Sequence, residues 1–200
     1  MKFSIALLLP ALALAQERAK FVPGGHTLSG PGCDPNTYDV VYSGSGQFVN
    51  EFATVTFRDY NATFPDPERE KFCNVFFTID FPVGCTTVNY DNTVTGAFRL
   101  DPGVTGTVIR DYVLERSTAF PDPANLLLTS ATPGPDYILD DDDFTSTTRI
   151  DTANQRLTRF GLQSRVFVQR NNNNANGWVS QDVWAASITD QSYAPTCCKS

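Results

Sequence analysis

The chain has 200 residues, with 15 Lys and Arg against 22 Asp and Glu, so its formal net charge is −7 at pH 7. Nucleic acids and anionic membranes are bound through clustered positive charge, so we expect neither as a partner. Aromatic residues make up 12% of the chain, and it contains 13 Gly and 13 Pro. This composition favours strands and turns over helices.

The first 15 residues have the pattern of a secretory signal peptide. Lys2 supplies a basic start, an apolar run extends to Leu14, and Ala13 and Ala15 provide the small residues of a cleavage site before Gln16. The run is too short to span a membrane. We therefore predict a secreted, extracellular protein, in which cysteines form disulfides rather than metal or redox sites.

Residues 16–32 are rich in Gly and Pro and are predicted to form a flexible N-terminal arm. The arm carries His26, the only histidine of the chain. A catalytic triad or dyad needs an imidazole held by a packed scaffold, so we read His26 as a surface residue and assign no catalytic residue. Residues 33–200 suit one domain with a single core.

Apolar and polar residues alternate with a period of two along most of this domain, which is the pattern of strands with one buried face. Turns rich in Pro, Gly and Asp separate the alternating segments. The predicted fold class is all-β, an antiparallel β-sandwich or jelly-roll stapled by disulfides. The predicted strands include Ala53–Phe57, Cys73–Phe81, Val94–Leu100, Val104–Leu114, Phe144–Ile150, Leu162–Gln169 and Trp178–Ile188.

Two aromatic pairs on these strands can be interpreted in two ways. Phe72 and Phe76 point opposite to Phe77, so their strand is either central and covered on both faces, which we predict, or exposes an apolar patch. Trp178 and Trp184 share one face of a single predicted strand. We predict that both are core residues; exposed, they would stack on sugar rings.

Three acidic or modifiable groups are candidate sites. The sequon that begins at Asn61 lies in a polar, proline-flanked segment and predicts a glycosylated loop. The run Asp140, Asp141, Asp142 and Asp143 is read as a solvated loop, with calcium binding as the alternative. A glycosidase needs two carboxylates that face one sugar, and Asp80 with Glu115 is a possible pair that no local pattern distinguishes.

Five segments form a recognisable set of motifs: Gly32-Cys33, the predicted strand at Phe52–Phe57, Phe72-Cys73-Asn74-Val75, Phe81-Pro82-Val83-Gly84 and the run from Gly96 to Gly106. In these segments the chain resembles one group of small secreted fungal proteins known only as a domain of unknown function. That group shows an early Gly-Cys, a Cys that opens a strand ending in Pro-x-Gly, and an aromatic-x-Leu-Asp-x-Gly-Val segment. The resemblance implies secretion and an all-β fold, and it brings no agreed activity.

Five cysteines allow at most two intramolecular disulfides. Cys197 and Cys198 are adjacent, and a bond between neighbours strains the backbone. The early-Cys pattern of the similar group implies a Cys33–Cys73 bond. Cys85 follows the Pro82-Val83-Gly84 turn, and we predict that it bonds to Cys197 or Cys198 and so anchors the C-terminus. The alternative pairs Cys73 with Cys85 and Cys33 with a C-terminal cysteine.

We therefore expect a secreted monomer that acts by surface recognition of an extracellular protein or glycan, without catalysis, cofactor or metal. A cell wall, an extracellular matrix or a host tissue is the expected setting, with a fungal effector or virulence role as a hypothesis. Two alternatives stay open from the sequence: a cell-wall polysaccharide hydrolase that uses paired carboxylates, and a calcium-dependent carbohydrate binder.

Overall fold

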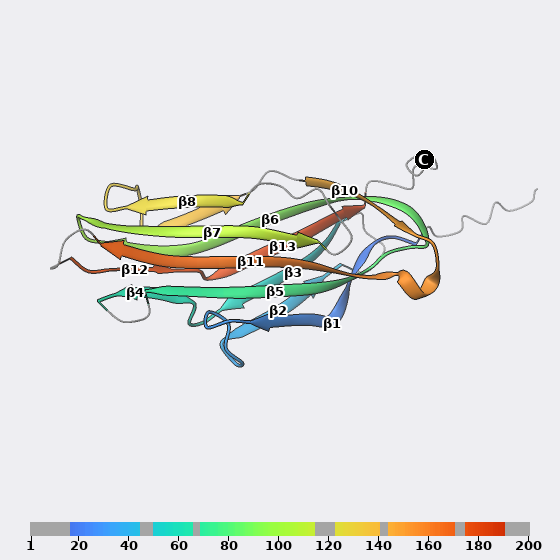
Figure 1. Ribbon diagram of the computed structural model, residues 1–200, viewed down its shortest axis with the longest axis horizontal. Helices are drawn as coiled ribbons and strands as arrows, with labels where there is room; N and C mark the ends of the chain where they lie inside the picture. Colours follow the sequence, from blue (N-terminus) through green and yellow to red (C-terminus); the bar gives the residue numbers. More distant parts are fainter. Residues whose placement is uncertain are drawn as a thin grey trace, which may run out of the picture.

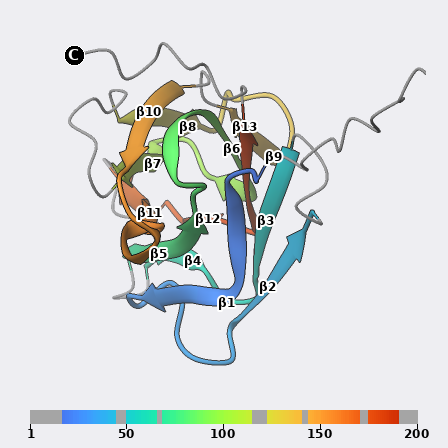
Figure 2. The same cartoon turned by 90° about the vertical axis from the view of Figure 1, so that its right-hand side faces the viewer.

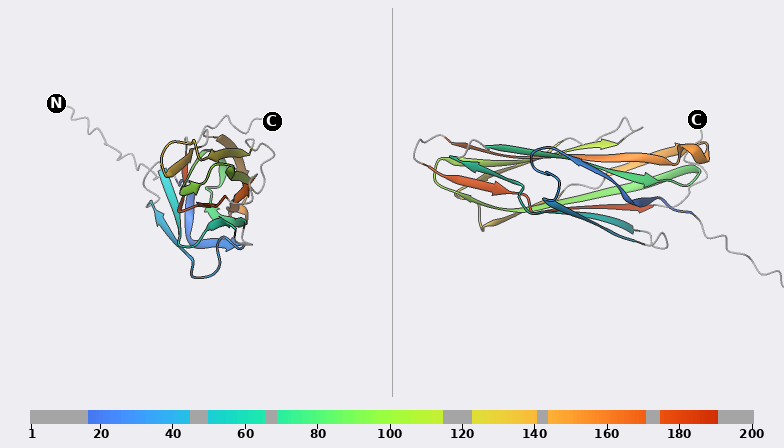
Figure 3. Two further views of the ribbon diagram at one scale, coloured as in Figure 1. Left: turned by 90° about the vertical axis from the view of Figure 1, so that its left-hand side faces the viewer. Right: turned by 90° about the horizontal axis from the view of Figure 1, so that it is seen from below.

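The structure, a computed structural model, describes residues 17–44, 50–65, 69–114, 123–140, 144–170 and 175–190. In this part of the chain two antiparallel β-sheets face each other as a sandwich, and the strands run along its long axis (Figures 1 and 3). This architecture confirms the predicted all-β sandwich. None of the described residues belongs to a helix long and apolar enough to cross a membrane.

The first sheet has five strands in the order β1-β5-β11-β7-β8. Its central strand, β11, is hydrogen-bonded along its length to β5 on one side and to β7 on the other. The strands are β1 (Lys20–Ser29), β5 (Glu70–Asp80), β11 (Leu157–Arg170), β7 (Val104–Leu114) and β8 (Ala124–Thr129).

The second sheet has eight strands, several of which lie end to end along the long strand β6 (Gly84–Leu100). One edge of β6 pairs with β13 (Val183–Asp190) and then with β12 (Gly177–Ser180). The other edge pairs with β10 (Phe144–Ile150) and then β9 (Asp136–Asp140). Outside β13 and β12 lie β2 (Tyr38–Ser43), β3 (Asn50–Phe57) and β4 (Asn61–Phe64).

The core lies between the two sheets and follows the predicted alternation. In β5 the inward residues Cys73, Val75, Phe77 and Ile79 are at most 1% exposed. The ring of Phe77 stacks on Trp184 of the opposite sheet, with centroids 5.0 Å apart. Contacts of this kind between the sheets hold the register of both, because a slip of one residue would turn every inward side chain to solvent.

The predicted flexible arm at residues 16–32 is wrong for most of its length. Lys20–Ser29 forms β1, which pairs with β5 and buries Phe21 between the sheets. The Pro-Gly-Gly sequence that suggested a loose arm lies at a shift of register between Phe21 and His26, where a bulge accommodates residues that fit a ladder poorly. His26 is half-buried, and its Nδ1 lies 2.9 Å from the hydroxyl of Tyr42 on β2.

The disulfide Cys33–Cys73 is present, with Cα atoms 5.6 Å apart, which confirms the predicted pairing and excludes a Cys73–Cys85 bond. It fixes the segment after β1 to the buried face of β5. Cys85 is also disulfide-bonded. Its predicted partners, Cys197 and Cys198, lie outside the described residues.

Phe72 and Phe76 are half-buried rather than fully covered. Their strand is flanked by β1 and β11, as a central strand should be, but none of the described strands forms a third layer over the outer face of this sheet (Figure 2). The guanidinium of Arg159 lies over the ring of Phe76 at 4.8 Å from its centroid. The prediction that this strand is central is therefore confirmed, but the outer face that carries Phe72 and Phe76 is only partly buried.

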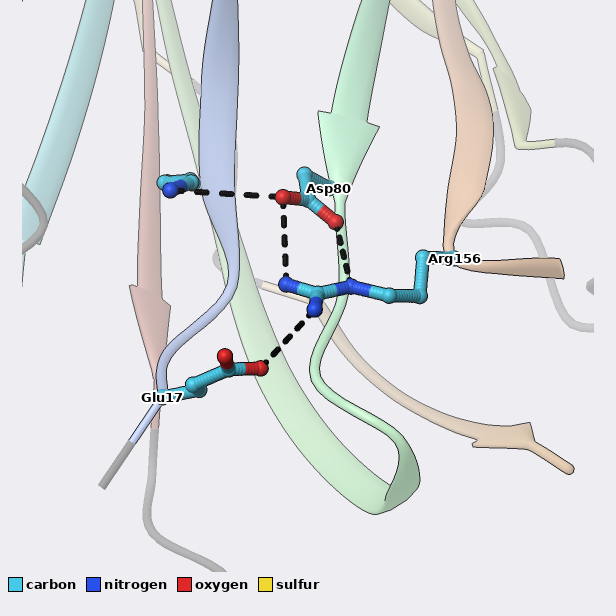
Figure 4. A network of polar contacts seen from close by, with 4 residues as sticks. Glu17, Asp80 and Arg156 are labelled. Atoms are coloured by element: carbon cyan, nitrogen blue, oxygen red, sulfur yellow. Dashed lines mark hydrogen bonds and ion pairs between the residues drawn. The ribbon is translucent and has the colours of Figure 1, made fainter. Parts of the chain in front are cut away.

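One end of the sandwich is closed by ion pairs around Arg156, next to the short 3-10 helix η1 (Ala153–Gln155) (Figure 4). Arg156 contacts both carboxylate oxygens of Asp80, at 2.8 and 3.2 Å, and one oxygen of Glu17 at 2.9 Å. The Nζ atom of Lys20 lies 4.0 Å from Asp80. These contacts tie the segment before β1 to the end of β5 and to the start of β11.

Candidate functional site

The strongest candidate for a functional surface lies at the opposite end of the sandwich, around Trp178 on β12 (Figure 1). Trp178 is 37% exposed, whereas Trp184 is fully buried. The prediction that both are core residues is therefore right for Trp184 and wrong for Trp178.

The two tryptophans face different ways because the predicted single strand is interrupted at Gln181 and Asp182. The amide of Gln181 donates to the carbonyl of Tyr60, and the amide of Asp182 donates to the carbonyl of Thr95, at 2.8 and 2.9 Å. This break between β12 and β13 shifts the alternation by one residue. It leaves the indole of Trp178 on the outer face of the sheet.

A hollow of about 320 Å³ lies beside Trp178, lined also by Arg99, Asp101, Asn176 and Gly177. Asp101 and Asn176 are held together by two hydrogen bonds. The backbone amide of Asn176 donates to the Asp101 carboxylate at 2.9 Å, and the backbone amide of Asp101 donates to the backbone carbonyl of Asn176 at 3.0 Å. These bonds dock the turn after β6 onto the start of β12.

Gly177 has a steric role in this hollow. A Cβ atom at this position would lie 2.9 Å from side-chain atoms of both Leu100 and Val104, and 3.2 Å from the carbonyl oxygen of Arg99. The absence of a side chain therefore allows β12 to approach β6 closely. That approach brings Trp178 directly opposite Arg99 in the paired register.

The hollow combines an aromatic face with a guanidinium, a carboxylate and an amide. The indole of Trp178 offers apolar area and a ring face. The Arg99 side chain carries only hydrogen-bond donors, and the Asp101 carboxylate carries only acceptors. The side-chain amide of Asn176 carries both. A few polar groups that converge beside an aromatic surface are the common pattern of small-ligand sites. A sugar ring presents the complementary chemistry, with C–H groups on one face and hydroxyls around its edge.

The sequon Asn61-Ala62-Thr63 lies in β4 and not in the predicted loop. Asn61 and Thr63 face outward, while Ala62 is fully buried. Thr63 is paired with Trp178, and Asn61 with Ser180. The sequon therefore borders the candidate site.

The remaining candidates from the sequence do not converge on a site. Asp140 is exposed on β9, and Asp141, Asp142 and Asp143 lie outside the described residues. Within the described ranges no group of three or more His, Cys, Asp or Glu could hold a metal ion. Asp80 is engaged by Arg156, as Figure 4 shows, and Glu115 lies outside the described residues.

Sequence reasoning missed Arg99, Asp101 and Asn176 as site residues. Asp101-Pro102-Gly103 and Asn176-Gly177 are recognisable as turns, but nothing in the sequence says that these two turns meet. The strand break at Gln181 and Asp182 also lacks the Gly or Pro that usually marks an interruption.

Comparison with known proteins places the chain in a family. Residues 24–197 match DUF4360, a domain of unknown function, and the chain belongs to that family. The match agrees with the resemblance to an uncharacterised family. No curated protein matches the chain.

Several solved structures are similar in fold at low identity. TmCBM61, solved in complex with β-1,4-galactotriose, is 11% identical with a TM-score of 0.25, and the alignment covers 82% of this chain and 91% of that one. The family 11 carbohydrate-binding module from Clostridium thermocellum is 8% identical, with a TM-score of 0.23 and coverage of 84% and 94%. A chain of Broad Bean Stain Virus is 12% identical, with a TM-score of 0.32 and coverage of 81% and 90%. None of these likenesses bears on function.

Proposed function

We propose that this protein is a secreted, non-catalytic glycan-binding protein and that Trp178 is the platform on which a sugar ring stacks. The observation that carries the proposal is the exposed indole beside the hollow lined by Arg99, Asp101 and Asn176. An exposed apolar side chain alone would not point to function, but an indole beside converging polar groups is the common arrangement of a ligand site and favours a binding role.

The setting that we propose is extracellular, in a cell wall, a matrix or a host tissue, and a fungal effector role belongs to the same proposal. The signal-peptide pattern of residues 1–15 supports the extracellular setting. Binding without catalysis is proposed because Asp80, the described member of the candidate carboxylate pair, is occupied by its ion pair with Arg156.

The test is a glycan array with the purified protein, followed by calorimetric titration with the best oligosaccharide. Trp178→Ala should weaken binding about ten- to a hundredfold, the loss expected when about 1.5–3 kcal/mol of apolar burial is removed. Trp178→Phe should retain most of the affinity because it keeps a ring. Incubation with the bound polysaccharide should release no reducing ends.

Phe52→Ala is the matched control. Phe52 is 43% exposed on the outer face of β3, in the same sheet as Trp178, and it does not line the hollow. Its removal should leave glycan affinity unchanged. Equal losses in the Phe52 and Trp178 variants, or no binding to any glycan, would contradict the proposed function.

A further inference from the structure

The break between β12 and β13 inserts one extra residue opposite β6. Val179 is paired with Phe98 and Val183 with Thr95, so three residues of the first segment face two residues of β6. An extra residue of this kind is a β-bulge, which changes the direction of the side chains on one side of it relative to those on the other. The contacts that hold this bulge therefore determine where Trp178 points.

Ser180 lies at the start of the bulge and is held through both its side chain and its backbone. Its hydroxyl accepts a hydrogen bond from the amide of Ala97 at 3.2 Å and donates one to the carboxylate of Asp182 at 2.8 Å. The hydroxyl thus takes the place that a backbone carbonyl would have in a regular ladder. The carbonyl of Ser180 instead accepts a hydrogen bond from the hydroxyl of Tyr137 at 2.7 Å.

Tyr137 reaches Ser180 from the far side of β6. It lies on β9, which pairs with the edge of β6 opposite to β12, and in that pairing Tyr137 is the partner of Gly96. A Cβ atom on Gly96 would lie 2.1 Å from the Ser180 carbonyl oxygen and 2.5 Å from the Tyr137 hydroxyl oxygen. The two groups can meet across β6 only because residue 96 has no side chain.

The bond between Tyr137 and Ser180 is shielded from water, since Tyr137 is only 5% exposed. A carbonyl that loses its donor in such a place pays a desolvation cost, which favours a rearrangement that gives it a new partner. In a regular ladder that partner would be a backbone amide of β6. A carbonyl that turned back toward β6 would remove the bulge and with it the outward direction of Trp178.

We propose that Tyr137 is a positioning residue of the Trp178 platform, and that its hydroxyl acts through Ser180 across the space left by Gly96. Tyr137 does not line the hollow beside Trp178, so it acts without touching the ligand. The effect on affinity rests on the proposed glycan-binding function. The direction of the indole does not, and it can be measured without any glycan.

The test combines fluorine NMR of protein labelled with 5-fluorotryptophan and calorimetric titration with the best oligosaccharide from the glycan array. The chain has two tryptophans, and Trp178→Phe assigns their resonances. Exchange of water for D2O should shift the resonance of the exposed Trp178 and leave that of the buried Trp184 in place. Tyr137→Phe removes only the hydroxyl, and it should move the Trp178 resonance, reduce its solvent shift and weaken glycan binding about tenfold.

Gly96→Ala is a second variant that breaks the same contact without altering Tyr137. It should change the Trp178 resonance and the glycan affinity in the same direction, and it decides the question if Tyr137→Phe does not fold. Thermal melts establish that each variant is folded.

Tyr42→Phe is the matched control, since it removes a hydroxyl that also joins two strands but lies away from the bulge, 2.9 Å from Nδ1 of His26. It should leave the Trp178 resonance and the glycan affinity unchanged. Equal effects of Tyr42→Phe and Tyr137→Phe would reduce the result to a general loss of packing and overturn the proposal. An unmoved Trp178 resonance in folded Tyr137→Phe protein would also overturn it.

The two readouts separate this inference from the proposed function. If the unaltered protein binds no glycan, the proposed function fails, and the fluorine resonances alone decide whether Tyr137 directs the indole. If glycan binding is lost in Trp178→Ala and kept in Tyr137→Phe, the platform is supported and the positioning role of Tyr137 is contradicted.

Discussion

Replacing Phe77 by Ala should remove more stability than any neighbouring substitution on β5. Phe77 is fully buried, and its ring centroid lies 5.0 Å from that of Trp184, 5.4 Å from Phe21 and 5.9 Å from Tyr42. It therefore joins both sheets and the edge strands β1 and β2. Deleting a buried Phe side chain typically costs about 3–5 kcal/mol, because the apolar contacts are lost and a cavity remains.

The neighbouring residue provides the control. Phe76 is the same residue type on the opposite face of β5, half-buried beneath the guanidinium of Arg159. Phe76→Ala should cost about 1–2 kcal/mol, from partial burial and one exposed cation–π contact.

The assay is urea and thermal denaturation followed by circular dichroism. At this chain length each kcal/mol lowers Tm by about 2–4 °C, so Phe77→Ala should lower it by about 6–20 °C. Equal losses for Phe76→Ala and Phe77→Ala would refute the register of β5 and the sheet pairing built on it.

Three further predictions concern pH, the disulfide and the sequon. Burial raises the pKa of Tyr42 to about 12, above the ordinary tyrosine value of 10.0. The unfolded chain therefore loses this proton at lower pH than the folded protein, and the free energy of unfolding should fall as pH rises from 10 to 12. Thermal melts across this range measure the fall, and a constant Tm would contradict the burial of Tyr42. Reduction of the Cys33–Cys73 bond, or its replacement by two alanines, should cost about 2–5 kcal/mol in urea denaturation, and an unchanged midpoint would show that the bond is dispensable. A glycan on Asn61 should cover part of the Trp178 platform, so Asn61→Gln protein should bind glycans more tightly than the glycosylated form, and equal affinities would place the glycan away from the indole.

Much of the fold could be predicted because the alternation of apolar residues is a local property of the chain. The inward face of β5, from Cys73 to Ile79, can be read from every second residue. A sheet with one buried face requires that pattern, and only a strand repeats with a period of two. The early cysteine pattern of the similar group also predicted the Cys33–Cys73 bond correctly.

The position and make-up of the candidate site depend on pairing between segments that are distant in the sequence, and a local sequence pattern does not reveal such pairing. Whether Trp178 faces solvent depends on a strand break that is held by the carbonyls of Tyr60 and Thr95, residues far away in the sequence. The strand β1 formed for a similar reason, since the edge of β5 offers unpaired backbone groups that a Gly- and Pro-rich segment can still join through a bulge. Local sequence therefore determined which residues alternate between the two faces of a strand. The tertiary structure decided which residues meet, because backbone hydrogen bonds between strands join segments that are far apart in the sequence.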